Sequence, residues 1–246
     1  MTRIAVPAAS AQLGASLALL LLGAGGALAG DRALIDIRGF SADSRYFAFE
    51  EFGIQDGSGF PYSTLYALDL AADAWVAGTP VRVRLDDEAT SLATARAAVA
   101  AQADELLHGL GIDTAAEFIA LNGDGELTDG TTLVFGRPGF APNAVEDAYV
   151  LRLDTFPATS PTPCADYSGT EPLGLALSLT GPNGVREIFR DTTLPASRGC
   201  PLAYRLYGVV APQYAAPPAA HVAIVATYPF GFEGPDRRFI AIPLGP

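Results

Sequence analysis

Positive charge is scarce in this chain of 246 residues, which has 15 lysines and arginines against 27 aspartates and glutamates and a formal net charge of −12. Binding to DNA or RNA phosphates requires clustered cations, so nucleic acid is not an expected partner. An anionic membrane surface is disfavoured for the same reason. The acidic balance by itself predicts solubility and indicates no specific partner.

Groups that commonly carry catalysis are also few. The chain has two histidines, His108 and His221, and it lacks an HExxH zinc motif, a GxSxG nucleophile elbow and a glycine-rich phosphate loop. Glu50 and Glu51 are adjacent, and adjacent residues of a strand face opposite sides, so they cannot form a catalytic pair by themselves. We therefore expect no cofactor and name no catalytic residue. An enzyme would have to assemble its site from distant segments.

Cysteine is limited to Cys164 and Cys200, and no CxxC spacing is present. An even number of cysteines in an exported chain predicts one disulfide. Prolines crowd both cysteines, so the bridge would join two irregular segments. The alternative is a reactive or metal-binding thiol pair, for which histidine partners are scarce.

The first 29 residues have the features of an export signal. Arg3 supplies positive charge, Leu13 to Leu22 is a short apolar stretch, and residues 27–29 form a small-x-small cleavage site. Cleavage is expected between Ala29 and Gly30. The apolar stretch is too short for a comfortable membrane span, so no stable membrane anchor is expected after cleavage.

Most of the remaining chain consists of short runs in which apolar and polar residues alternate, a pattern typical of half-buried strands. In residues 81–85, for example, Arg82 and Arg84 alternate with apolar side chains. About eleven strands are expected, in a β-sandwich or partly closed barrel. Residues 30–246 are expected to form a single β-rich domain, with a possible division near 138–143.

Residues 88–108 differ, because their apolar side chains recur at helical spacing. Asp86 and Asp87 can cap the start of a helix there, and Gly109 can end it. This is the one long helix expected, packed on a sheet. Residues 112–120 can form a short second helix.

Two turn-rich segments carry arginines in a chain that holds few of them. Residues 194–201 contain Arg198, and residues 231–239 contain a mixed cluster: Glu233, Asp236, Arg237 and Arg238. Arginine pairs well with carboxylates, so these residues can fasten corners of the fold near the disulfide. The functional alternative is a patch that binds an anion or a carboxylate.

Two further segments are candidate binding sites. Phe60 and Tyr62 are expected on a rigid contact loop, together with Tyr214 on another, where aromatic side chains suit glycan or protein partners. Residues 122–130 place carboxylates at alternating positions, with Asp124, Glu126 and Asp129 as candidate calcium ligands. Leu127 and Leu133 stand where a calcium loop of the EF-hand type requires Gly and Glu, so a solvated acidic turn is the main interpretation.

Together with the two arginine segments, the motifs at residues 45–50 (RYFAFE) and 55–61 (QDGSGFP) identify a resemblance. The chain resembles the "predicted secreted protein" family of Gram-negative bacteria, whose domain has no known function. The resemblance spans Gly39 to Ile240. It implies export to the periplasm or the exterior of a Gram-negative cell, and it implies no activity, cofactor or functional residue.

These observations favour a non-catalytic binding or envelope-accessory protein whose partner is an envelope protein or a glycan. One alternative is a hydrolase that acts on a cell-envelope polymer. A second alternative is a calcium-dependent adhesion module.

Overall fold

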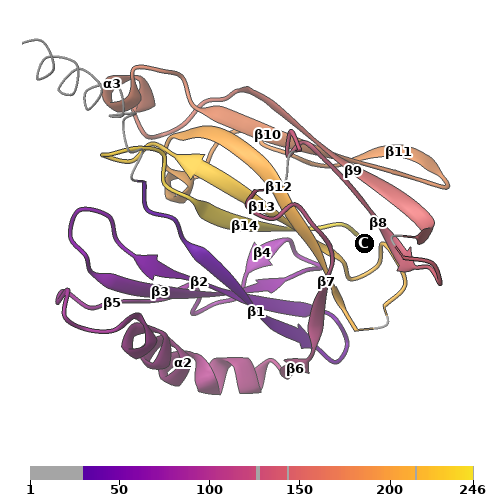
Figure 1. Ribbon diagram of the computed structural model, residues 1–246, viewed down its shortest axis with the longest axis horizontal. Coiled ribbons are helices and arrows are strands. Elements are labelled where there is room, and N and C mark those ends of the chain that lie inside the picture. The colour runs from indigo at the N-terminus through magenta and orange to yellow at the C-terminus, as the bar shows by residue number, and fades with distance from the viewer. Residues whose placement is uncertain (1–29, 126–127, 143, 214, 246) are drawn as a thin grey trace, which may run out of the picture.

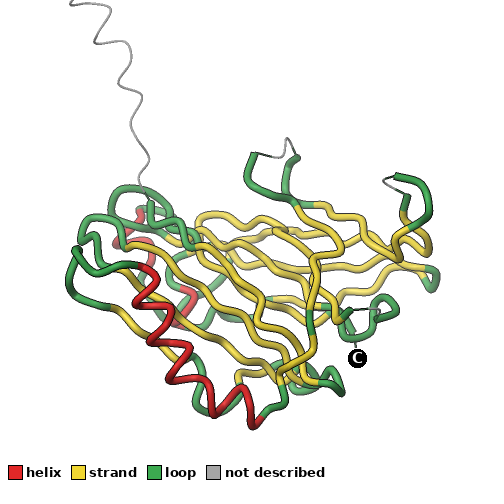
Figure 2. The backbone as a smooth tube through the Cα atoms, turned by 60° about the horizontal axis from the view of Figure 1, so that its bottom comes forward, coloured by secondary structure: helices red, strands yellow, loops and turns green. Residues whose placement is uncertain are grey.

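The computed structural model describes residues 30–125, 128–142, 144–213 and 215–245, so the predicted export signal and Ala29 lie outside the described residues. Fourteen strands form three antiparallel sheets, and one long helix lies against them (Figures 1 and 2). The predicted class, mainly β with one long helix, is confirmed, although the expected number of strands was too low. Within the described ranges no sheet closes into a barrel.

The first sheet has six strands, in the order β4 (Ala74–Trp75), β3 (Pro61–Asp69), β2 (Tyr46–Ile54), β1 (Leu34–Ser41) and β6 (Ile112–Thr114), with β5 (Val81–Arg84) also paired to β3. The second sheet has the order β11 (Gly184–Arg190), β10 (Leu173–Gly181), β9 (Val145–Pro157) and β8 (Thr132–Pro138). The third sheet has the order β14 (Arg238–Pro243), β13 (Val222–Pro229), β12 (Pro201–Pro212) and β7 (Ala116–Leu121).

The third sheet is the middle layer of the molecule (Figure 1). Val225 of β13 packs among residues of the second sheet, whereas its neighbours Ile224 and Ala226 pack among phenylalanines of the first sheet. Both faces of β13 are therefore buried, which explains why its sequence is a continuous apolar run rather than an alternating one. The structure stacks three sheets where the sequence led us to expect the two of a sandwich.

The long helix, α2 (Leu92–Gly109), forms a fourth layer on the outer face of the first sheet. Its buried face consists of Ala95, Val99 and Ala103, which repeat at helical spacing as predicted. The predicted N-terminal caps are wrong: Ser91 caps the start, because its hydroxyl accepts a hydrogen bond from the Thr94 amide. At the other end Gly109 is the last helical residue, as predicted, and Leu110 is the C-cap residue.

The short helix predicted at residues 112–120 is also wrong, since this segment forms β6 and β7. Its residues pair with β1 and β12, so tertiary pairing overrides a weak helical pattern. The hairpin turn at residues 181–184 joins β10 to β11, with Gly184 at a φ of 95°. β8 and β9 also pair as neighbours along the chain, and the Gly139 amide donates to the Ala144 carbonyl between them.

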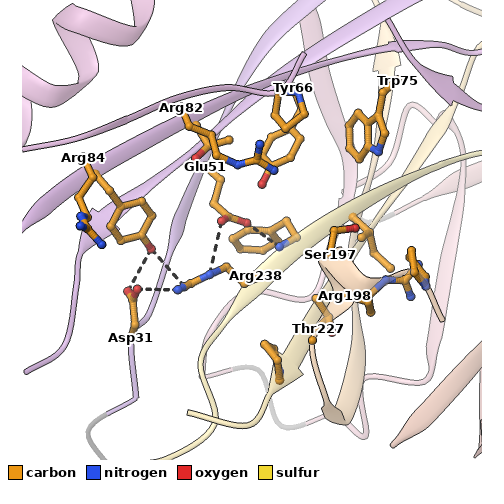
Figure 3. A pocket seen from close by; sticks show the side chains of 18 of the residues that line it. Asp31, Glu51, Tyr66, Trp75, Arg82, Arg84, Ser197, Arg198, Thr227 and Arg238 are labelled. Atoms are coloured by element: carbon orange, nitrogen blue, oxygen red, sulfur yellow. Dashed lines mark hydrogen bonds and ion pairs between the residues drawn. The ribbon is translucent and has the colours of Figure 1, made fainter. Parts of the chain in front are cut away.

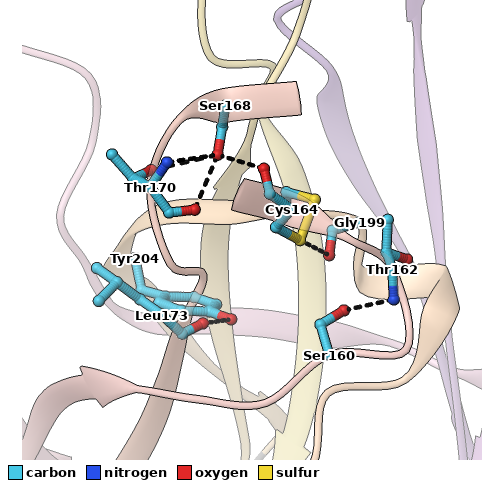
Figure 4. The surroundings of a disulfide bond; sticks show 9 residues. Ser160, Thr162, Cys164, Ser168, Thr170, Leu173, Gly199 and Tyr204 are labelled. Atoms are coloured by element: carbon cyan, nitrogen blue, oxygen red, sulfur yellow. Dashed lines mark hydrogen bonds between the residues drawn. A yellow bond between two sulfur atoms is a disulfide. The ribbon is translucent and has the colours of Figure 1, made fainter. Parts of the chain in front are cut away.

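The predicted disulfide between Cys164 and Cys200 is present, with the two Cα atoms 5.4 Å apart (Figure 4). It joins the start of the short helix α3 (Cys164–Ser168) to the end of the 3₁₀ turn η1 (Ala196–Arg198), just before β12. Tyr204 of β12 adds a second fastening nearby, because its hydroxyl donates to the Leu173 carbonyl at 2.9 Å. The bridge therefore ties the η1 turn and the start of β12 to α3.

Replacing both cysteines with alanine is expected to lower the free energy of unfolding by about 3 to 4 kcal/mol, because the unfolded chain loses its loop constraint. Urea unfolding of the oxidised protein and of the Cys164→Ala/Cys200→Ala variant measures the difference. Dithiothreitol should destabilise the wild type by a similar amount and leave the variant unchanged. Equal stability of the oxidised protein and the variant would contradict the prediction.

Candidate functional site

A pocket of about 570 Å³ opens between the first and third sheets, and we call it the intersheet pocket (Figure 3). This volume lies within the range of small-molecule sites. One wall comes from β2, β3, β4 and β5 of the first sheet, and the opposite wall comes from β13, β14 and the η1 turn. The polar residues of its lining are Asp31, Glu51, Gln55, Tyr62, Thr64, Tyr66, Arg82, Arg84, Ser197, Arg198, Thr227 and Arg238.

Strand alternation decides which side chains of the first sheet enter the pocket. On β5, Val83 packs toward helix α2 while Arg82 and Arg84 line the pocket. On β2, Glu51 lines the intersheet pocket, whereas Glu50 faces the helix side and lines a separate groove there. The structure thus confirms that these adjacent glutamates lie on opposite faces of the sheet.

The lining of the pocket reverses the charge balance of the chain. Four arginines line it against two carboxylates, whereas acidic residues outnumber basic ones nearly two to one over the full sequence. Every cation of the chain is an arginine, because the sequence contains no lysine. The pocket lining therefore concentrates arginines, side chains that can bind carboxylates in a bidentate manner, although carboxylates just outside the lining pair with three of them.

Arg238 is the hub of the pocket wall. Its Nη2 lies 2.7 Å from Asp31 Oδ2, its Nη1 donates to the Tyr62 hydroxyl at 3.2 Å, and its Nε lies 3.7 Å from Glu51 Oε1. The Asp31 and Glu51 side chains are each only 3% exposed. Because these partners surround the guanidinium, Arg238 organises the wall and has little capacity left for a ligand.

Glu51 is a buried carboxyl that also accepts a hydrogen bond from the Phe239 amide at 2.8 Å. Burial raises the pKa of Glu51 to about 7, although the positive charge of Arg238 acts in the opposite direction. Burial also raises the pKa of Asp31, again against the influence of Arg238. The Glu51 carboxyl therefore changes its charge near neutral pH.

Arg198 and Arg82 keep more of their hydrogen-bonding capacity than Arg238 does. Both hydrogen bonds of Arg198 use one nitrogen, Nη1, which lies 3.4 Å from Asp191 Oδ2 and 3.3 Å from the Tyr204 hydroxyl. Arg82 is exposed, and its side chain makes no hydrogen bond or ion pair with any residue that the structure describes. Arg84 forms an exposed pair with Asp86 at 2.7 Å, which contributes little to stability.

An aromatic surface lies in the same pocket. Trp75, the single tryptophan of the chain, is 44% exposed, and its ring centroid lies 4.9 Å from that of Tyr66. Tyr66 in turn stacks on the buried Phe49 at 4.8 Å. The tryptophan ring is thus supported from one side and open toward the pocket.

A second charged cluster, on the outer face of the first sheet, holds the helix. Arg96 of α2 donates from Nε to Glu50 at 2.8 Å and from Nη2 to Asp36 at 2.6 Å. Its guanidinium also lies 3.9 Å from the centre of the Phe52 ring. These contacts fasten α2 to the sheet and explain the buried charge of Glu50.

The arginine patch predicted from the sequence is divided by the structure. Arg198 and Arg238 line the pocket, whereas Arg237 is 3% exposed, pairs with Asp124 at 2.6 Å and donates to the Ala33 carbonyl. Asp236 accepts a hydrogen bond from the Asp31 amide at 2.9 Å. Glu233 lies exposed in the loop before β14.

The predicted contact loop is changed in a similar way. Tyr62 lies in β3 rather than in a loop, and its hydroxyl donates to Asp31 at 3.0 Å, so it belongs to the pocket wall. Phe60 is half-buried beside it, and Tyr214 lies outside the described residues.

The candidate calcium ligands are used in other ways. Asp124 pairs with Arg237, and Asp129 accepts from the Thr131 amide at 2.8 Å, while Glu126 lies outside the described residues. Across the described part of the chain, no cluster of three or more histidine, cysteine, aspartate or glutamate side chains could hold a metal ion. In the same part, helices long and apolar enough to cross a membrane are absent.

Neither histidine lines the intersheet pocket. His108 is exposed at the end of α2. His221 is 1% exposed, packs against Phe135, and has its Nδ1 atom 2.7 Å from the Ala219 carbonyl.

Most of the pocket lining carries no local signal of a pocket in the sequence, namely Asp31, Glu51, Tyr66, Trp75, Arg82, Arg84 and Thr227. The alternation of arginine and valine in residues 81–84 was the available signal. This alternation predicts a polar face of the strand, but it does not distinguish a face that lines a pocket from one exposed to solvent.

Replacing Glu51 with glutamine should remove a pH dependence of stability. Because the folded chain binds this proton more tightly, the stability contributed by Glu51 is complete below about pH 4.5 and is lost as the pH rises through 7. Between about pH 5 and pH 8, the wild type should lose about 2 to 3 kcal/mol relative to Glu51→Gln. Urea unfolding at both pH values measures this difference. The contribution of His221 to the pH dependence is the same in both proteins and cancels when they are compared. A difference that stays constant with pH would contradict the assignment.

No curated protein matches this chain. The model of one family, described as predicted secreted protein (DUF2259), matches residues 48–244. The match includes both arginine segments and confirms the resemblance inferred from the motifs. The chain therefore belongs to this family of predicted secreted proteins.

Proposed function

We propose that this secreted protein is a non-catalytic binding protein and that its ligand is an anion held in the intersheet pocket. The observation that carries the proposal is the gathering of four arginines around one pocket in a chain with a net charge of −12. Five segments distant in sequence supply the charged lining: the residues before β1, which include Asp31, then β2, β5, the η1 turn and β14.

The individual arginines support a division of roles. Arg238 is surrounded by Asp31, Glu51 and Tyr62, so it builds the pocket. Arg82 and Arg198, on opposite walls, retain N–H groups for a ligand. An arginine with a free edge can donate two parallel hydrogen bonds to a carboxylate or a sulfonate.

The disulfide supports a location where thiols oxidise, which is the periplasm or the cell exterior of a Gram-negative bacterium. The disulfide also bears on the site, since it anchors the turn that carries Ser197 and Arg198. An envelope ligand is consistent with that location. The hydrolase and calcium-dependent alternatives gain no support from the described residues.

The proposal is tested with anilinonaphthalene sulfonate, a fluorescent anion with aromatic rings that fits a cationic and aromatic pocket. We expect one dye molecule to bind per chain, with an affinity that falls as salt rises. Arg82→Ala or Arg198→Ala should weaken binding at least tenfold, because each removes charge-assisted hydrogen bonds.

Arg152→Ala is the matched control, since Arg152 is an exposed arginine on β9 of the second sheet and does not line the pocket. Its dye affinity should equal that of the wild type. Dye binding that is unchanged in both pocket variants would overturn the proposal. Circular dichroism of each variant establishes that it is folded.

A further inference from the structure

We infer that the anion is an acidic saccharide, in which a pyranose ring bearing a carboxylate stacks on Trp75 while its carboxylate pairs with Arg82 or Arg198. This inference rests on the proposed function, because it assigns a chemical class to the ligand of the same pocket. It depends on three features of the lining that only a few ligand classes satisfy together.

The first feature is the supported tryptophan ring. Trp75 is 44% exposed and lines the pocket, while Tyr66 fixes it from one side at a centroid distance of 4.9 Å. Pro80, Pro195 and Pro229 also line the pocket and restrict the backbone around it. A rigid, half-exposed indole gives a flat apolar surface at low entropic cost, and the C–H face of a sugar ring can pack on such a surface.

The second feature is the pair of arginines on opposite walls. Figure 3 shows Arg82 on the side of the first sheet and Arg198 on the side of the η1 turn. Arg198 has a side chain only 10% exposed, so a carboxylate that reaches it is partly shielded from water and binds more strongly. The planar guanidinium matches the two oxygens of a carboxylate.

The third feature is a set of hydroxyl groups without partners. The hydroxyls of Thr64, Tyr66 and Ser197 line the pocket and make no hydrogen bond with any described residue. Thr227 also lines the pocket, but its Oγ1 atom is buried beside the Tyr204 hydroxyl and is closed to a ligand.

The hydroxyls of Thr64, Tyr66 and Ser197 can donate to and accept from a ligand, so this lining suits a ligand that itself carries several hydroxyl groups. A simple aromatic carboxylate would use the tryptophan and the arginines and leave these hydroxyls unused. A neutral sugar would use the hydroxyls and the tryptophan and leave the arginines unused. A sugar acid matches all three features.

The test is isothermal titration calorimetry on the disulfide-bonded mature protein with two uronate probes, digalacturonate and a glucuronate disaccharide. We expect at least one of them to bind with a ratio of one to one. Its methyl ester, which keeps the sugar and removes the charge, should bind at least tenfold more weakly. Benzoate, which keeps a charge and a flat ring without hydroxyls, should also bind at least tenfold more weakly.

Three variants test the stacking contact and the hydroxyl contacts. Trp75→Ala should weaken uronate binding at least tenfold, whereas Trp75→Phe should stay within about threefold of the wild type, because a smaller aromatic ring remains. Thr64→Val keeps the shape of the side chain and should weaken uronate binding without changing benzoate binding. Arg152→Ala again serves as the control variant.

The outcomes separate this inference from the proposed function. If the dye binds in an Arg82-dependent manner and neither uronate binds, the saccharide class is overturned and the anion-binding pocket stands. If the dye is also indifferent to Arg82 and Arg198, both proposals fail together. Equal binding of the uronate and its methyl ester, or unchanged binding in Trp75→Ala, would also overturn the inference.

Discussion

The middle sheet has two apolar faces, and the rest of the structure depends on the need to cover both of them. Val222 to Ala226 of β13 are completely buried, and alternate residues point toward different neighbouring sheets. A strand of this kind cannot lie at the surface of a two-layer sandwich. The second sheet covers one face, the first sheet covers the other, and α2 then covers the outer face of the first sheet.

At the intersheet pocket, polar residues instead of apolar ones make the contact between the first sheet and the middle sheet. Along β14, Phe239 and Ala241 belong to the apolar contact with the first sheet, whereas Arg238 meets Asp31 and Glu51. Pairing stabilises these buried carboxylates, which would otherwise be expensive to bury. This ion-pair cluster therefore borders the apolar core at this end and also forms part of the pocket wall.

The disulfide acts on the same region from the other side. It fixes the end of the η1 turn, whose Arg198 is also tied to Asp191 and Tyr204. An exported protein works without the reducing systems of the cytoplasm, so a covalent bridge persists there. One wall of the pocket is therefore held by a covalent bond and the other by strand pairing. Both restrict the motion of the walls and so lower the entropic cost of ligand binding.

The mainly β fold class of this protein follows from its sequence, because alternation and helical spacing report which face of a strand or helix is buried. An even number of cysteines likewise indicates a disulfide. The sequence predicted a mainly β fold, the helix that contains Val99, the bridge from Cys164 to Cys200 and the opposite orientations of Glu50 and Glu51. Only the tertiary structure decided which polar faces meet. By its sequence pattern Arg82 is an ordinary exposed strand residue, but stacking of the sheets places it in a pocket wall. Arg237 and Arg238 are equivalent in the sequence, but only Arg237 is buried against Asp124. Such distinctions depend on contacts between segments up to about 200 residues apart, such as Asp31 and Arg238, and no local pattern contains them.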